Sequence, residues 1–282
     1  MTQILACIDG SILSTAVCDA GAWASERLEA PLLLLHALEK TESPEGNFAG
    51  NIGLGSREAL LEELTALDEQ RSKLALEHGK HMLEQAEARA KEDGAVNIKC
   101  MQRHGNLVET LLDMEESTRL YVMGRSGETH ESIAHSIGSH LESIVRAVHR
   151  PILITLPEFR APQSFMVAYD GSESVENALT SITDTPLLKG LPCHLVMVGE
   201  ASAERTQQMQ IAAERLEAAG HEVIRSFLDG DVLVKLQSYQ QRHQIELMVM
   251  GAYGHSRIRQ FFVGSTTRKM IAQSDIPLLV LR

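Results

Sequence analysis

The chain has 282 residues, of which 44% are hydrophobic, which is enough apolar material for two ordinary domains. Its formal net charge of -12 disfavours nucleic acids and anionic membranes as partners, because both bind basic surfaces. The N-terminus lacks the pattern of a signal peptide and the apolar runs are too short to span a bilayer, so we expect a cytoplasmic protein without a membrane partner. The four cysteines have no metal-ligand spacing, which predicts reduced thiols and no metal site.

The beginning of the chain predicts a strand, a helix and a second strand. Residues 3–9 form an apolar run that ends in Asp9, as expected of a strand that is buried on both faces. After a Gly-Ser turn, residues 14–28 carry apolar side chains at helical spacing, and residues 31–38 form another apolar run of strand length. Strands that alternate with helices indicate a parallel sheet with right-handed crossovers.

The next segment is the least repetitive part of the chain. Residues 39–55 are rich in Gly, Asn, Ser and Glu, which predicts a loop. Residues 57–91 are rich in Leu, Ala and Glu, which predicts a helix with an interruption near Gly79. The simplest interpretation of its charges is a solvated helix face. An alternative is a lid or partner-binding surface, because the second half of the chain has no counterpart.

Three further strands complete the first half, and a linker follows them. The strands are predicted at residues 97–103, 119–123 and 151–156, the helices at 107–117 and 139–149, and the linker at 158–163.

The order of elements then restarts, so the chain is a tandem repeat. Residues 164–170 repeat the first strand with its terminal acid, which is now Asp170, and a proline follows the acid by 22 residues in both halves. We therefore expect two tandem doubly wound α/β domains, residues 1–157 and 164–282, each with a five-stranded, mainly parallel sheet and helices on both faces. The apolar fifth strands predict edge-to-edge pairing between the domains, which would make an intramolecular pseudo-dimer.

A glycine-rich segment follows the fourth strand of each half. In the second half, Gly251 and Gly254 are followed after nine residues by Gly264 and Ser265. Glycine allows backbone amides to turn toward an anion, and the helix that is predicted from Ser265 onward adds its positive end. Because open parallel sheets bind ligands at the carboxyl ends of their strands, Asp170 and these glycines would face one crevice.

The first half carries an imperfect copy of the glycine pattern. Ten residues separate Gly127 from Gly138, and this spacer contains two glutamates, which repel phosphate. The corresponding spacer of the second half contains histidine and arginine instead. We therefore expect the second half to hold the better anion site.

Together these residues resemble tandem universal stress proteins of the UspA type, within the adenine-nucleotide α-hydrolase-like superfamily. The resemblance implies a stress-response protein that binds ATP, with or without Mg²⁺, chiefly in its second domain. Such a protein would act as a nucleotide-dependent regulator or sensor that is read by an unidentified protein partner, and the pseudo-dimer could also form a homodimer. The implied ligand-binding residues are Asp170, Val198, Gly251, Gly254, His255, Gly264, Ser265 and Thr266. The implied weaker site in the first domain consists of Asp9, Ala37, Gly124, Gly127, Gly138 and Ser139.

Simpler explanations remain open at this stage. The glycines could only permit tight turns, and Asp9 and Asp170 could cap helices. The protein would then be a scaffold or a binder of another small ligand. The sequence contains no nucleophile elbow, Walker lysine or paired acid and base, so we predict no catalytic residue, with weak ATP hydrolysis as the remaining enzymatic alternative.

Overall fold

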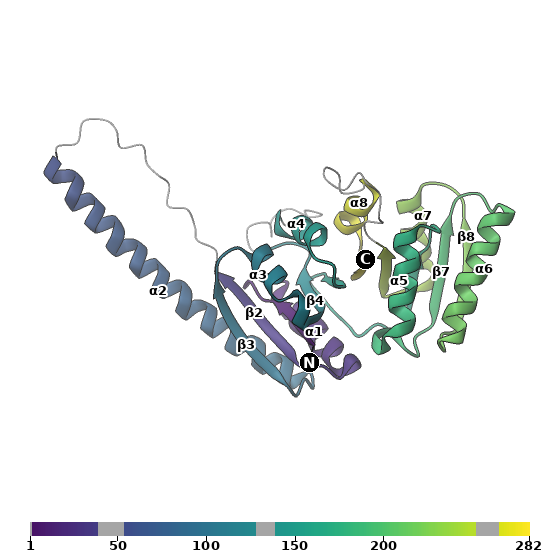
Figure 1. Ribbon diagram of the computed structural model, residues 1–282, viewed down its shortest axis with the longest axis horizontal. Helices are drawn as coiled ribbons and strands as arrows, with labels where there is room; N and C mark the ends of the chain where they lie inside the picture. Colours follow the sequence, from purple (N-terminus) through teal and green to yellow (C-terminus); the bar gives the residue numbers. More distant parts are fainter. Residues whose placement is uncertain (1, 39–53, 128–138, 252–264) are drawn as a thin grey trace.

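The computed structural model describes all residues except 1, 39–53, 128–138 and 252–264, and it leaves out the side chains of residues 54–62, 139, 265 and 266 as well. The described chain has two halves with nearly the same order of elements (Figure 1). The first half contains β1 (Gln3–Cys7), α1 (Ser14–Leu28), β2 (Leu32–Leu38), α2 (Leu54–Glu92), β3 (Ile98–His104), α3 (Leu107–Asp113), the 3₁₀ turn η1 (Glu115–Ser117), β4 (Thr118–Gly124), α4 (Ser139–Ala147) and β5 (Ile152–Thr155). The second half contains β6 (Phe165–Ala168), α5 (Glu173–Asp184), the 3₁₀ turn η3 (Pro186–Leu188), β7 (Cys193–Val198), α6 (Ala203–Ala218), β8 (Val223–Leu228), α7 (Val232–His243), β9 (Leu247–Gly251), α8 (Ser265–Gln273) and β10 (Leu278–Leu281).

The strands of both halves form one sheet in the order β3-β2-β1-β4-β5-β10-β9-β6-β7-β8. Strands are parallel within each half, whereas β5 and β10 pair antiparallel, with Leu153 opposite Leu279. This is the contact between fifth strands that the sequence predicts. In each half the strand order reverses beside the first strand, between β1 and β4 and between β6 and β9, so the expected doubly wound topology is present.

Helices cover both faces of the sheet, and each face has its own hydrophobic core. On one face α1, α2, α5 and α6 pack against alternate strand residues such as Ile4 and Leu279. On the other face α3, α4, α7 and α8 pack against the intervening residues, such as Leu5 and Leu278. Both cores include residues from the two halves. The alternation of side chains along β5 and β10 therefore links the halves above and below the sheet.

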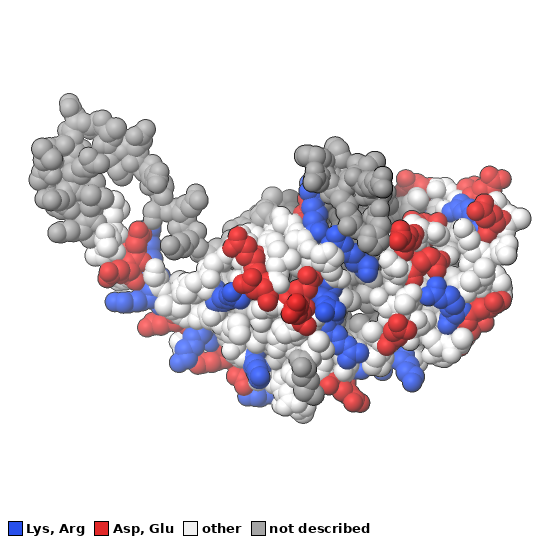
Figure 2. Space-filling model, in the orientation of Figure 1, with Lys and Arg blue, Asp and Glu red and all other residues white. Residues whose placement is uncertain are grey.

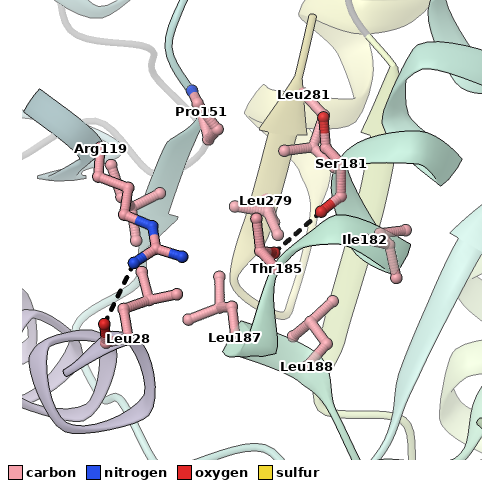
Figure 3. A pocket seen from close by; sticks show the side chains of 11 residues that line it. Leu28, Arg119, Pro151, Ser181, Ile182, Thr185, Leu187, Leu188, Leu279 and Leu281 are labelled. Atoms are coloured by element: carbon pink, nitrogen blue, oxygen red, sulfur yellow. Dashed lines mark hydrogen bonds between the residues drawn. The ribbon is translucent and has the colours of Figure 1, made fainter. Parts of the chain in front are cut away.

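The junction between the halves is also closed by side chains on the α1 and α5 face. Leu28, Leu187 and Leu279 surround a cavity of about 30 Å³, and the guanidinium of Arg119 donates a 3.2 Å hydrogen bond to the Leu28 carbonyl (Figure 3). Arg27 of α1 donates to the carbonyl of Leu187 at 3.0 Å and also to those of Pro186 and Lys189. Apolar packing and arginine-to-carbonyl hydrogen bonds thus hold the halves together here.

Helix α2 is continuous, so the predicted interruption near Gly79 is wrong. The helix has 39 residues, which corresponds to about 58 Å at 1.5 Å per residue. Its C-terminal part is anchored to α1 by Arg89, which donates to both carboxylate oxygens of Asp19 at 2.8 and 3.1 Å. Its other end extends beyond the sheet (Figure 1). Gly79 provides close packing, because a Cβ there would meet Nε2 of Gln102 and would lie 2.6 Å from Cδ2 of the buried His36.

Charges of both signs lie on the face of the molecule that is drawn in Figure 2. On the face drawn in Figure 2, the described lysines and arginines are interspersed with aspartates and glutamates over both halves. Within the described residues, no helix is both long enough and apolar enough to cross a membrane.

The pairing of β5 with β10 predicts a large cost for truncating Leu279, which is 2% exposed. We expect Leu279→Ala to lower the free energy of unfolding by about 2–5 kcal/mol, because it enlarges the cavity at the junction. Urea denaturation of the full chain measures the change. The control is Ile211→Ala on α6, where the side chain is 51% exposed and the expected loss is below about 0.5 kcal/mol. Equal losses for the two variants would contradict the role assigned to the junction.

The packing of Gly79 predicts that Gly79→Ala destabilises the protein although alanine favours helices. The helix propensity gain is about 1 kcal/mol, whereas overpacking a buried contact costs about 1–3 kcal/mol. We expect a net loss of about 1 kcal/mol in thermal or urea unfolding. Ser72→Ala, at an exposed position of the same helix, should cause no loss. A stabilised Gly79→Ala variant would show that His36 yields without cost.

Candidate functional site

A crevice of about 330 Å³ opens at the carboxyl ends of β6, β7 and β9. Asp170, Val198 and Gly251 line it from the ends of these strands, and Thr267 and Met270 line it from α8. The structure therefore brings together three of the residues that the sequence singles out in the second half. The strand order reverses at this point, and β6 and β9 are direct neighbours, which is why the turn after β6 lies beside the end of β9.

Asp170 is exposed and lies in the turn between β6 and α5. Its Oδ1 accepts a 2.9 Å hydrogen bond from the backbone amide of Ser172, and Gly171 has a φ of 75°. Ser172 is itself the N-cap residue of α5, so Asp170 does not cap this helix, contrary to one of the simpler explanations. Among the described residues, no hydrogen bond to Oδ2 of Asp170 is found. One carboxylate oxygen therefore organises the turn, and the other lies at the crevice without a hydrogen bond from the described residues.

Asp9 occupies the corresponding turn of the first half, but it has more internal partners. Its Oδ1 accepts from the Ser11 amide at 3.0 Å and from the Ser14 hydroxyl at 3.2 Å. Its Oδ2 lies against Gly127, where a Cβ would be 3.1 Å away. In the second half Val175 takes the place of Ser14, so the hydroxyl donor is missing there. The two acids thus occupy similar turns with different numbers of internal hydrogen bonds.

Helix α2 also covers part of the first-half turn. A Cβ on Gly10 would lie 2.5 Å from Sδ of Met82, and one on Gly79 would lie 3.0 Å from Nε2 of His36. Nδ1 of His36 is 2.8 Å from the carbonyl oxygen of Ile8, so this ring is fixed between the end of β1 and the helix. Ala37, the next residue along β2, is half-buried and pairs with Arg103.

Close packing explains the glycine at the end of each fourth strand. A Cβ on Gly251 would lie 2.7 Å from the backbone carbon of Ser174 and the amide nitrogen of Val175, in the first turn of α5. A Cβ on Gly124 would lie 2.9 Å from Cβ and Cδ1 of Leu13. Both glycines are required by the approach of a helix, whether or not a ligand is bound. These two glycines therefore have a steric role in packing, which differs from the tight turns that the sequence suggests as the simpler explanation.

The remaining predicted residues are placed less completely. Gly138, Gly254, His255 and Gly264 lie outside the described residues. Ser139 begins α4, and Ser265 and Thr266 begin α8, but these three side chains are not described.

Several residues of the site are missed by sequence reasoning. Thr267 and Met270 face the crevice from α8, and Val232 and Leu236 face it from α7. Their spacings of three and four residues are helical, which is the one signal that could have indicated them. Arg205 of α6 donates to the carbonyl oxygens of Val198 at 3.0 Å and Glu200 at 3.1 Å, so it fixes the end of β7.

A polar network holds α5, which forms one wall of the crevice. Tyr169 donates a 2.5 Å hydrogen bond to Oε1 of Glu176, and Arg215 of α6 donates to Oε2 at 2.8 Å. Burial, followed by the hydrogen bond to Glu176, raises the pKa of the Tyr169 hydroxyl, so it remains a donor at neutral pH. Within the described chain, no group of three His, Cys, Asp or Glu side chains is arranged to hold a metal ion.

The comparisons agree with this architecture. The universal stress protein family pattern matches residues 1–155 and 194–282, and therefore matches both halves. Universal stress protein Slr1230 of Synechocystis is 32% identical over 289 residues, with 100% of both chains covered. The chain belongs to the universal stress protein family. Asp170 lies in the segment between the two matched ranges, so its role does not follow from the family match.

Two solved structures share the fold of the whole chain. A universal stress protein from Archaeoglobus fulgidus has a TM-score of 0.70 at 17% identity, covering 99% of this chain and 98% of its own. A functionally unknown protein from Pseudomonas aeruginosa has a TM-score of 0.64 at 14% identity, covering 100% and 92%. The arrangement of two halves is thus found in other proteins of similar length.

The contact of Gly251 with α5 predicts that Gly251→Ala destabilises the protein in the absence of any ligand. We expect a loss of about 1–3 kcal/mol in the free energy of unfolding, because the added methyl group meets backbone atoms. Denaturation without added nucleotide measures it. Gly127→Ala is the matched control, since among the described atoms its Cβ would meet one carboxylate oxygen, at 3.1 Å. An unchanged stability of Gly251→Ala would contradict the packing role.

Proposed function

We propose that this protein is a stress-response regulator that binds an adenine nucleotide, ATP, in the crevice of its second half. The observation that carries the proposal is the meeting of Asp170, Gly251 and Thr267 around one crevice at the point where the strand order reverses. Its volume of about 330 Å³ is within the range of small-molecule sites. Apolar residues such as Val198 and Met250 offer surface to a base, and Asp170 offers an acceptor to hydroxyl groups.

The phosphates would lie at the start of α8. The glycine spacing from Gly251 to Gly264 and the helix N-terminus at Ser265 support this part of the proposal, since amides and a helix dipole favour an anion there. The hydroxyls of Ser265 and Thr266 would add donors, and His255 would add a donor from the spacer. The bound nucleotide would change the surface near the start of α8, and a protein partner would bind this changed surface.

The preference for the second half rests on the different surroundings of the two acids. Asp9 accepts hydrogen bonds from Ser11 and Ser14, its Oδ2 lies close to Gly127, and α2 covers the adjacent turn. Asp170 accepts one hydrogen bond from the described residues. A ligand in the first half would have to replace internal hydrogen bonds, which weakens its net binding.

One observation favours a second candidate function, the binding of an apolar or neutral small molecule. The described lining of the crevice contains many apolar side chains and no lysine or arginine, and Asp170 is its one charged residue among those described. Such a ligand would not need the glycine segment. Titration with ATP separates the two candidates, because only the first predicts binding of the triphosphate.

Asp170→Asn tests the proposal, with Asp9→Asn as its matched control. Asparagine can still accept the hydrogen bond from the Ser172 amide, so the turn is retained while the charge and one acceptor are lost. Calorimetric titration of the full chain with ATP should give about one site per chain in the wild type. We expect about tenfold weaker binding or more for Asp170→Asn, from the loss of a charged hydrogen bond, and unchanged binding for Asp9→Asn. Absence of ATP binding by the wild type, or a larger effect of Asp9→Asn, would contradict the proposal.

A further inference from the structure

The C-terminal end of α8 is held by an arginine from the other half of the chain. Arg125 Nη1 donates a 2.8 Å hydrogen bond to the carbonyl oxygen of Ser274, the residue that follows α8. Ser274 is 3% exposed, and Arg125 is half-buried. The pair therefore lies away from bulk solvent, where a charge-assisted hydrogen bond is stronger than on the surface. A cation at this end of a helix is also favoured by the helix dipole.

Arg125 has a rigid attachment within the first half. It lies between Gly124 and Gly127, and its backbone amide donates to the carbonyl of Thr155 at 3.1 Å. A Cβ on Gly127 would lie 3.1 Å from Oδ2 of Asp9, in the turn after β1. The described start of this glycine segment thus lies between the turn at Asp9 and the end of α8.

The first turns of α4 and α8 are connected as well. Oε2 of Glu142 lies 3.8 Å from Nε of Arg268, and Oε1 of Glu142 accepts a 2.8 Å hydrogen bond from Arg146. These two helices follow the glycine segments of the first and second halves (Figure 1). Helix α8 therefore meets the first half near both of its ends.

The C-terminal end of α4 in the first half is held in a similar way by an arginine of the second half. Val148 is the counterpart of Ser274 in the first half, and its carbonyl accepts from Arg282 at 2.8 Å. Ala252, the counterpart of Arg125, has no side-chain donor. Each half thus donates a hydrogen bond from an arginine to the carbonyl at a helix end of the other half. Of these two arginines, Arg125 belongs to a glycine segment and Arg282 does not. Arg282 is thus a matched control for Arg125.

We infer that Arg125 is a positioning residue for the crevice of the second half. Arg125 belongs to the first half and acts on this crevice through its contact with the end of α8. By holding the Ser274 carbonyl it fixes the helix that carries Thr267 and Met270 to the crevice. The inference rests on the proposed function for its binding readout. The inference also gives the first half a part in ligand binding, because a ligand that contacts α8 binds to a helix whose position the first half restrains. By linkage, ligand binding and this restraint change each other's free energy by the same amount.

The test compares full-length wild type with Arg125→Met, Arg125→Lys and Arg282→Met. Methionine keeps an unbranched apolar stem and removes the donors, and lysine keeps the charge with a shorter reach. Calorimetric titration with ATP should show about three- to tenfold weaker binding for Arg125→Met, the usual range for residues that act through a network, with partial recovery in Arg125→Lys. Arg282→Met should bind ATP as the wild type does. Unchanged affinity in Arg125→Met, or an equal loss in Arg282→Met, would overturn the inference.

Hydrogen exchange without nucleotide gives a second readout that does not depend on the proposed function. Amides of residues 267–274 should exchange faster in Arg125→Met than in the wild type, whereas Arg282→Met should accelerate exchange in α4 instead. If Arg125→Met does not fold, Arg125→Lys carries the comparison. If the wild type binds no ATP, the proposed function fails, and unchanged exchange in α8 of the Arg125 variants would then separately refute the positioning role.

Discussion

The antiparallel pairing of β5 with β10 is the interaction on which the rest of the molecule depends. Each of these strands would otherwise be an exposed edge of a five-stranded parallel sheet, with unpaired backbone groups and apolar side chains on both faces. Their pairing removes both edges and makes the two cores continuous. It also sets the helices of one half beside those of the other, so that arginines can reach carbonyl groups across the junction.

The two halves share a topology but differ in the surroundings of the acid that follows their first strand, and a few residues account for the difference. Ser14 binds Asp9 in the first half, whereas valine stands at this position in the second. Met82 and Gln208 occupy matching places over the glycine that follows the acid. Gly79 lets α2 lie against His36, whereas its counterpart Arg205 caps the end of β7. Duplication of a fold therefore leaves room for one half to bind a ligand and the other to support it.

Much of the fold could be predicted from the sequence because its signals are local. Helix α1 spans the predicted residues 14–28, and the apolar fifth strands at the end of each half indicated their pairing. The site could be predicted in part, since Asp170 and Gly251 follow from strand ends and the repeat, and Val198 follows from the family resemblance. The contact of Arg125 with Ser274 joins residues 149 positions apart, and no periodicity marks it. Gly79 and Gly251 are glycines for steric reasons that depend on packed neighbours, so their sequence positions alone suggested other roles.

We propose that one crevice of this tandem protein, the one at Asp170 and Gly251, binds a nucleotide. Native mass spectrometry of the intact chain with increasing ATP counts bound nucleotides directly. We expect that one ATP per chain saturates first and that a second binds only at much higher concentration or not at all. Two equivalent sites, or a chain that stays free of nucleotide at millimolar ATP, would contradict it.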